Sequence, residues 1–161
     1  FSRRRRHTRL HEKSRGLGDV YKRQVLYVSV MQTVHIEREL PTTAAVAYDH
    51  FVQPELLVLW WPSEAECDPQ VGGEYRMFWE APGVTLRGQY RKTVPGRQLA
   101  FTWKWDHEDL PPRLVDVIFT STQRGCVVSV THDAGSDDEA SDYTNGWIHF
   151  LGRLQNALSH T

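Results

Sequence analysis

The sequence predicts an α+β domain in which an antiparallel sheet packs against one long carboxy-terminal helix. Residues 74–132 contain runs in which apolar and polar residues alternate, separated by short turns, and this pattern is typical of an antiparallel sheet with one apolar face. Residues 140–158 place large apolar side chains three and four positions apart, as one face of a helix requires. Two short helical segments precede the strands. Helices separated along the chain from a block of strands are expected on one side of the sheet.

The body of the chain opens with a strand and a short helix. Residues 33–40 alternate well enough to predict a strand, and Pro41 ends it. Thr42 or Thr43 can then cap a helix that Pro54 closes. The side chains expected on the apolar side of this helix are Val46, Ala47 and Phe51.

A second short helix is expected over Glu55–Trp61, ending at Pro62. Two tryptophans, Trp60 and Trp61, stand side by side at its end. Because adjacent residues of a helix do not share a face, we expect one indole to pack inward. The other is expected near the surface or at the mouth of a cavity.

Five strands are expected next, because from Ala65 onward the apolar residues recur every second position. Their apolar faces consist of Tyr75, Met77 and Trp79; Val84, Leu86, Gly88 and Tyr90; Leu99, Phe101, Trp103 and Trp105; Val115, Val117 and Phe119; and Val128, Val130 and His132. The connections are turns at 81–83, 95–96 and 123–125 and a polar loop at 106–112. Short connections of this kind predict a meander of neighbouring antiparallel strands.

The clearest helical signal lies at the carboxyl end of the chain. Ser136 with Glu139 three residues later forms a capping box, and Asp137 and Asp138 add negative charge at the positive end of the helix dipole. The apolar face that follows consists of Tyr143, Trp147, Phe150, Leu151, Leu154 and Leu158. Burying each of these side chains stabilises a fold by roughly 1.5–3 kcal/mol. The helix therefore needs the apolar face of the sheet opposite it.

Charge divides the chain near residue 30. Residues 1–30 hold 9 of the 19 Lys and Arg and 2 of the 20 acidic residues, which leaves a net charge of −8 on residues 31–161. An arginine-rich arm is typical of nuclear targeting or nucleic-acid binding, but residues 1–24 resemble translated sequencing adapter from a metagenomic contig. We therefore expect residues 1–30 to be non-native or disordered, translation to start at Met31, and residues 31–161 to form one domain.

Composition narrows the classes of partner and compartment. Cys67 and Cys126 occur without a CxxC or a matching pattern of histidines, so neither a disulfide framework nor a zinc site is indicated. The acidic body would repel phosphates, which argues against nucleic acid. No run approaches the ~20 apolar residues of a membrane span, and Val25–Val30 is too short for the core of a signal peptide. We expect a cytoplasmic protein with no membrane partner.

The sequence lacks the motifs that carry cofactor or metal chemistry. It contains no GxSxG, Walker loop, HExxH or dinucleotide fingerprint, so no cofactor is expected. The sequence Asp106-His107-Glu108-Asp109 offers metal-ligating atoms, but adjacent loop residues rarely converge on one ion, and a solvated turn is the better interpretation. The acidic run 133–142 lacks the spacing of a calcium loop and is assigned to helix capping. No metal site is expected.

Short motifs along residues 34–160 form an ordered series. They include Arg38-Glu39-Leu40-Pro41, Pro54-Glu55, Trp60-Trp61-Pro62, Val71-Gly72-Gly73-Glu74-Tyr75-Arg76, Gly88-Gln89-Tyr90, Thr102-Trp103-Lys104-Trp105, Thr131-His132 and Gly146-Trp147. The series resembles the activator of Hsp90 ATPase homologue 1-like (AHSA1-like) family, within the START/Bet v 1-like (SRPBCC) superfamily. The resemblance implies a helix-grip fold, in which a curved antiparallel sheet wraps the long helix. It also implies a cavity between them that holds a small apolar or amphipathic molecule.

The aromatic residues of the apolar face are the candidates for contact with such a ligand, because they exceed what a compact core of this size needs. Tyr and Trp add polar tips that can orient a ligand. The expected ligand-binding residues are Trp61, Tyr75, Met77, Trp79, Tyr90, Phe101, Trp103, Trp105, Phe119, His132, Trp147 and Leu151. Plain core filling is the alternative for each of them.

His132 is the titratable member of this set, since alternation places it on the same face as Val128 and Val130. Three roles stay open for it: a structural histidine satisfied by one neighbour, a polar anchor for a ligand, or a general base near neutral pH. It is the one candidate catalytic residue.

Three functions follow from these observations. The first is a small-ligand-binding protein, with Tyr90 or His132 orienting an apolar or aromatic molecule. The second is a cyclase- or hydrolase-type enzyme that uses the same cavity, ranked lower because no convergent acid and base pair is visible. The third is an Hsp90 co-chaperone-like module with Hsp90 as its partner, ranked below the first because only the module that corresponds to the carboxy-terminal domain of the eukaryotic activator is recognisable in the chain. A homodimer stays open.

Overall fold

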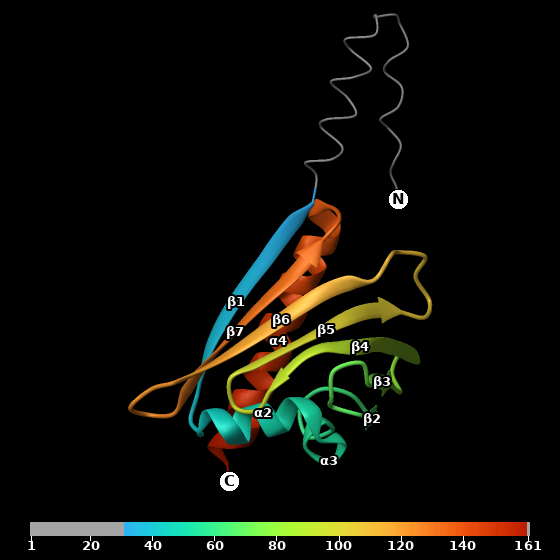
Figure 1. The fold of residues 1–161 in the computed structure, drawn as a ribbon. Coiled ribbons are helices and arrows are strands. Elements are labelled where there is room, and N and C mark those ends of the chain that lie inside the picture. Colours follow the sequence, from blue (N-terminus) through green and yellow to red (C-terminus); the bar gives the residue numbers. More distant parts are fainter. Residues whose placement is uncertain (1–30, 161) are drawn as a thin grey trace, which may run out of the picture. The chain divides into compact units, whose positions relative to one another are not determined.

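The computed structural model describes residues 31–160, and the elements below belong to the unit that begins at Gln32. The hypotheses about residues 1–30 lie outside the described residues. The elements, drawn in Figure 1, are β1 Gln32–Leu40, α2 Ala44–Val52, α3 Pro54–Leu57, β2 Glu64–Cys67, β3 Glu74–Trp79, β4 Val84–Val94, β5 Gln98–Trp105, β6 Arg113–Ser121, β7 Cys126–Ala134 and α4 Asp137–Ser159. The expected α+β architecture is confirmed.

The seven strands form one curved antiparallel sheet in the order β1-β7-β6-β5-β4-β3-β2. Strands β2 to β7 follow one another as the expected meander. Strand β1 departs from it, because it pairs with the last strand, Gln32 lying opposite Ala134. The segment that contains α2 and α3 carries the chain from β1 at one edge of the sheet to β2 at the other (Figure 1). Strand β2 was not predicted, since four residues are too few for alternation to stand out.

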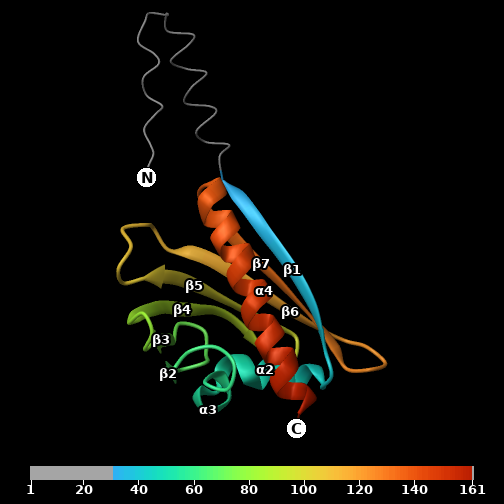
Figure 2. The ribbon, with the colours of Figure 1, turned by 180° about the vertical axis from the view of Figure 1, so that it is seen from behind.

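The long helix α4 lies across one face of the sheet and contacts β1 and β7, as Figure 2 shows from behind. Its start is the predicted one: the Ser136 hydroxyl accepts from the Glu139 backbone N–H at 3.1 Å. The residues that α4 buries are Tyr143, Trp147, Leu151, Leu154 and Leu158. Phe150 was expected among them but is only half-buried. No helix among residues 31–160 is long and apolar enough to cross a membrane.

Helix α2 is capped as predicted, because the Thr43 hydroxyl accepts from the Val46 backbone N–H at 3.2 Å. The expectation that Val46 lies on its buried side is wrong, since this side chain is 39% exposed. The buried face is set by Ala44, Ala47 and Phe51, three or four positions apart, and Val46 falls off that stripe.

The helix before the two adjacent tryptophans is shorter than expected. Helix α3 ends at Leu57 rather than at Trp61, so the helical spacing argument does not apply to Trp60 and Trp61. Both indoles are buried, 0% and 5% exposed, and their rings stack at 5.1 Å with an interplanar angle of 22°. The Trp60 Nε1–H donates to the His50 carbonyl oxygen at 2.9 Å, which satisfies its one donor.

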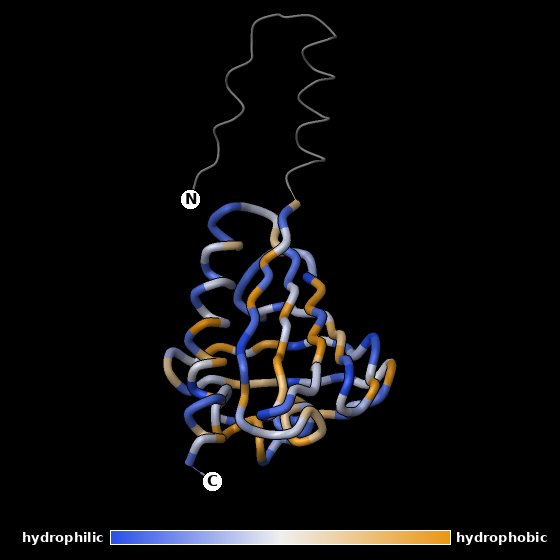
Figure 3. The backbone as a smooth tube through the Cα atoms, turned by 90° about the vertical axis from the view of Figure 1, so that its left-hand side faces the viewer, coloured by the Kyte–Doolittle hydropathy of each residue, from blue (hydrophilic) through white to orange (hydrophobic). Residues whose placement is uncertain are grey.

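Alternation along the strands gives the sheet its apolar face, and Figure 3 shows apolar and polar positions following one another along the tube. In β7 every second residue from Cys126 to Ala134 is buried. That face and the apolar side of α4 form one hydrophobic core. The packing is incomplete at the first half of α4, where the candidate site lies.

Candidate ligand-binding site

A cavity of about 420 Å³ lies between the sheet and the first half of α4. Its volume falls within the range typical of small-molecule sites. Strands β3, β4 and β5, the segment after α3, the β3–β4 turn, the β5–β6 loop and α4 all contribute to its wall. The lining residues are Trp61, Trp79, Ala81, Pro82, Val84, Trp103, Trp105, His107, Glu108, Glu139, Asp142, Tyr143, Gly146, Trp147 and Phe150.

Five of the six tryptophans of the chain form a continuous aromatic wall in this cavity, which we call the tryptophan cluster. Its members are Trp61, Trp79, Trp103, Trp105 and Trp147. Neighbouring ring centroids lie 5.1 to 6.0 Å apart, from Trp61 and Trp147 at the short end to Trp61 and Trp79 at the long end. These spacings and their tilted or edge-to-face angles are those that attract aromatic rings to one another. The rings therefore brace a wall that faces open volume.

The expected ligand-binding residues divide into two groups in the structure. The tryptophan cluster lines the cavity. Tyr75, Met77, Tyr90 and Phe101 instead pack with Phe51 and leave no space as large as a water molecule. Phe119 and Leu151 are buried in the core, and His132 is 0% exposed and does not line the cavity.

Several lining residues escaped the sequence analysis. Tyr143 and Phe150 were assigned to the helix face but not to the site, and Gly146, Asp142 and Glu108 were not considered for it. A signal was present for the helical ones, because Asp142, Gly146 and Phe150 recur at intervals of four along α4 and so share a face. The loop residue Glu108 carried no such signal, since only the fold brings it to the cavity.

Two indole donors of the tryptophan cluster are unsatisfied. The Nε1–H groups of Trp79 and Trp103 are buried and have no hydrogen-bond partner in the described part of the chain. A buried donor without an acceptor costs about 1–3 kcal/mol. Native proteins leave few such groups, so two of them in one cavity wall are consistent with a site that receives an acceptor.

His132 lies behind the cavity wall. Its ring stacks on that of Tyr143, with centroids 3.7 Å apart and planes at 8°, and its Nδ1 accepts from the Trp147 Nε1–H at 3.0 Å. Indole can only donate, so the imidazole proton sits on Nε2, which is buried and unpartnered among residues 31–160. Burial, helped by the charge of Arg113, lowers the pKa of His132 to about 3. The imidazole is therefore neutral at pH 7, with its lone pair already engaged, and the geometry gives no support to a general base.

A buried ion pair fixes the start of α4 against the sheet. The Arg113 guanidinium on β6 donates from Nε and Nη2 to the Glu139 carboxylate, at 2.9 and 2.7 Å, and the two side chains are 11% and 13% exposed. The Gly135 backbone N–H donates to the same carboxylate at 2.9 Å. Although burial raises the pKa of Glu139, the hydrogen bonds from Arg113 and Gly135 hold it below its ordinary value. Glu139 thus acts both in the helix cap and as a counter-ion.

Replacing Glu139 by glutamine is expected to lower the free energy of unfolding by about 2 kcal/mol. The change leaves the Arg113 guanidinium buried without its counter-charge, which is the costly way to break such a pair. The matched control is Asp138→Asn, which removes a charge from an exposed position in the same helical turn and should cost less than about 1 kcal/mol. Urea unfolding of both variants at pH 7 measures the difference. Equal losses would show that Arg113 does not depend on Glu139.

No group of His, Cys, Asp or Glu within residues 31–160 is arranged to hold a metal ion. In the loop at the cavity mouth the ring of His107 lies beside Trp105, with centroids 5.6 Å apart. The His107 Nε2 is 3.9 Å from the Glu108 carboxylate. The groups that the lining offers are aromatic faces, indole donors, carboxylates and the His107 imidazole.

Comparison with known proteins adds the family. The family model described as activator of Hsp90 ATPase homolog 1-like protein matches residues 41–159. Protein MLL2253 of Mesorhizobium loti has a solved structure of TM-score 0.73 at 21% identity, covering 81% of this chain and 98% of that one. CalU16 of Micromonospora echinospora gives a TM-score of 0.68 at 18% identity, covering 80% and 77%.

A third solved structure is DynU16 of the dynemicin biosynthetic locus, with a TM-score of 0.72 at 18% identity over 79% of this chain and 47% of that one. Among curated proteins no relative matches. At these identities the solved structures show a shared fold, with the curved sheet and long carboxy-terminal helix of the helix-grip type.

Proposed function

The chain belongs to the AHSA1-like family of the SRPBCC superfamily, and on that premise we propose that it binds a small apolar or aromatic molecule in the cavity between the sheet and α4. The observation that carries the proposal is the tryptophan cluster. Five indoles line about 420 Å³ of open volume, and three of them, Trp61, Trp103 and Trp147, also belong to the hydrophobic core. An aromatic ligand in that volume gains both from its own burial and from ring-to-ring contact.

The indole donors give such a ligand an orientation. The N–H groups of Trp79 and Trp103 are buried without an acceptor among the described residues, so a carbonyl, ether or hydroxyl oxygen of the ligand would satisfy either one once its indole turns toward the cavity. Sites of this class combine mostly apolar walls with a few placed polar groups. The proposal assigns the walls to the tryptophan cluster, Tyr143 and Phe150, and the orienting groups to the two indole donors.

The test is a titration of the full chain with N-phenyl-1-naphthylamine, a neutral aromatic probe. Binding in the cavity should quench the tryptophan emission and raise the probe emission along one saturable curve, with one probe bound per chain. The urea-unfolded chain, which keeps the same six tryptophans, is the control and should show no saturable signal. Absence of saturable uptake by the folded chain up to the solubility limit of the probe would overturn the proposal.

A further inference from the structure

We propose that the ligand of this cavity carries a positive charge, a quaternary or protonated amine, beside its aromatic or apolar body. This inference rests on the proposed function, because it names the class of molecule that the same cavity would take. Its basis is the combination of aromatic faces inside the cavity with two carboxylates in its lining, that of Asp142 and that of Glu108, whose one described ion-pair partner is the His107 imidazole at 3.9 Å.

The charges that line the cavity are of one sign. Glu108, Glu139 and Asp142 contribute carboxylates, and no Lys or Arg is among the described lining residues. Glu139 is neutralised by the two hydrogen bonds from Arg113. Asp142 makes no ion pair with another described residue. Asp142 is exposed and the Glu108 side chain is 41% exposed, so both carboxylates stand at the open side of the cavity, where no described Lys or Arg offsets their charge.

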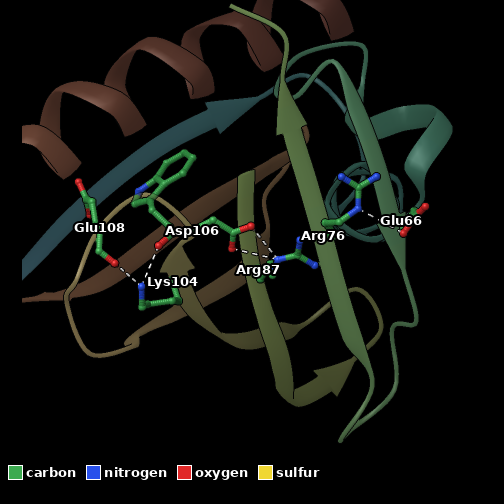
Figure 4. A network of polar contacts seen from close by, with 7 residues as sticks. Glu66, Arg76, Arg87, Lys104, Asp106 and Glu108 are labelled. Atoms are coloured by element: carbon green, nitrogen blue, oxygen red, sulfur yellow. Dashed lines mark hydrogen bonds and ion pairs between the residues drawn. The ribbon is translucent and has the colours of Figure 1, made fainter. Parts of the chain in front are cut away.

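The two carboxylates approach the cavity from different elements. Asp142 lies on α4, one position before Tyr143, and Glu108 lies in the β5–β6 loop. Glu108 lies close enough to α4 to affect Tyr143 electrostatically. Burial raises the pKa of the Tyr143 hydroxyl, and the negative charges of Glu139 and Glu108 raise it further. The side chain of Glu108 accordingly extends toward α4 in Figure 4.

Lys104 holds the β5–β6 loop by backbone contacts that leave the negative charge of Glu108 in place. Its ammonium donates to the backbone carbonyls of Trp105, at 2.8 Å, and of Glu108. Figure 4 shows the ammonium on the opposite side of the loop from the Glu108 carboxylate. The lysine thus ties down the loop through backbone carbonyl oxygens and not through the Glu108 carboxylate.

Aromatic faces add to the preference for a cation. The face of an indole ring is the best cation–π partner among the side chains, and the attraction grows when the cation is desolvated. Quaternary ammonium groups are bound in proteins by aromatic cages of this composition. A neutral ligand would gain only from the walls, and an anionic ligand would meet the Glu108 and Asp142 carboxylates.

The experiment compares three probes that share one 2-naphthylethyl body. They end in trimethylammonium, in its uncharged tert-butyl isostere and in carboxylate, and each is titrated at pH 8, where free imidazole is neutral. Tryptophan quenching gives the dissociation constants. The cation should bind at least ~10-fold more tightly than the isostere, and the carboxylate more weakly than either.

The double variant Glu108→Gln, Asp142→Asn should weaken binding of the cation about 5- to 10-fold and leave the isostere unchanged. Asp138→Asn is the matched control, because Asp138 is exposed on the same helix and does not line the cavity, and it should leave all three constants unchanged.

The outcomes separate this inference from the proposed function. Equal binding of the cation and the isostere by the natural chain would overturn the inference and leave a cavity for neutral ligands. A preference for the cation that persists in the double variant would overturn it as well, because the carboxylates would not be its source. Binding of none of the probes would count against the proposed function itself.

Discussion

Replacing Gly146 by phenylalanine is expected to abolish ligand binding while the chain stays folded. Gly146 lies on α4 in the cavity lining, and a Cβ added there would meet no atom within 4 Å. The phenyl ring would therefore enter open volume rather than the core. It would occupy much of the about 420 Å³ that a ligand needs, so binding of N-phenyl-1-naphthylamine should weaken by at least ~100-fold, or about 2.7 kcal/mol.

Two alanine variants make this result interpretable. Gly146→Ala changes the same position but keeps most of the cavity. Gly152→Ala changes the same helix outside the cavity lining, where the added Cβ would lie 3.7 Å from the Arg38 guanidinium, an ordinary contact. Alanine is favoured over glycine inside a helix by up to about 1 kcal/mol. Both variants should be slightly more stable than the natural chain and bind the probe unchanged. A well-folded Gly146→Phe variant with undiminished binding would place the ligand elsewhere.

The second large effect is a loss of stability on mild acidification that depends on His132. Its pKa is lowered to about 3 in the folded chain, against about 6.5 for free histidine. The unfolded chain therefore takes up the proton first. The contribution to stability is complete above pH 6.5 and is lost progressively as the pH falls toward 3, by up to about 1.4 kcal/mol per pH unit.

The surroundings of His132 explain why a proton is so unfavourable there. The imidazole is buried, the Arg113 guanidinium adds positive charge nearby, and the Trp147 indole already donates to Nδ1. Protonation would set two donors against each other at that contact. Tyr143 covers one ring face, and the Glu139 carboxylate, 3.4 Å from the Tyr143 hydroxyl, is engaged by Arg113.

Urea unfolding between pH 7 and 4.5 measures this effect. The slope of the unfolding free energy against pH should shrink in His132→Asn, which cannot take up a proton. It should persist in His35→Gln, which alters an exposed histidine on β1. The measured pH range stops at 4.5. Below that value protonation of the Glu139 carboxylate, whose pKa is depressed in the folded chain, also lowers the free energy of unfolding. An unchanged slope in His132→Asn would refute the assignment, and an NMR titration in which His132 becomes charged above pH 5 would do so without any variant.

The features that local pattern encodes were predictable from the sequence. The capping hydroxyl of Ser136 and the apolar spacing along α4 depend on residues within a few positions of one another, and both are confirmed. The alternation that revealed β3 to β7 is equally local. The same reasoning misplaced the end of α3, which is Leu57 rather than Trp61, although Trp60 does pack inward and Trp61 does line the cavity.

The candidate site was predictable in kind but not in extent. Alternation identifies the face on which Tyr75 and Trp103 lie, but both ends of the sheet share that face. The helix side chains opposite this face decide which end holds a cavity. Phe51 from α2 fills the end near Tyr75. At the other end α4 has Gly146, which carries no side chain to fill the space. The pair of Arg113 and Glu139 is 26 residues apart in sequence, so no local pattern could reveal it.

The most direct test of ligand binding in this cavity is a titration of the full chain with N-phenyl-1-naphthylamine, followed in the indole region of the ¹H–¹⁵N spectrum. Six indole signals are expected, one for each tryptophan, and single Trp→Phe variants assign them. Binding in the cavity should move the signals of Trp79 and Trp103 most, because their N–H groups have no partner among the described residues. The signal of Trp60, held by the His50 carbonyl outside the cavity lining, should move least. Saturation with the probe that leaves the Trp79 and Trp103 signals in place would contradict the assignment of this cavity as the ligand site.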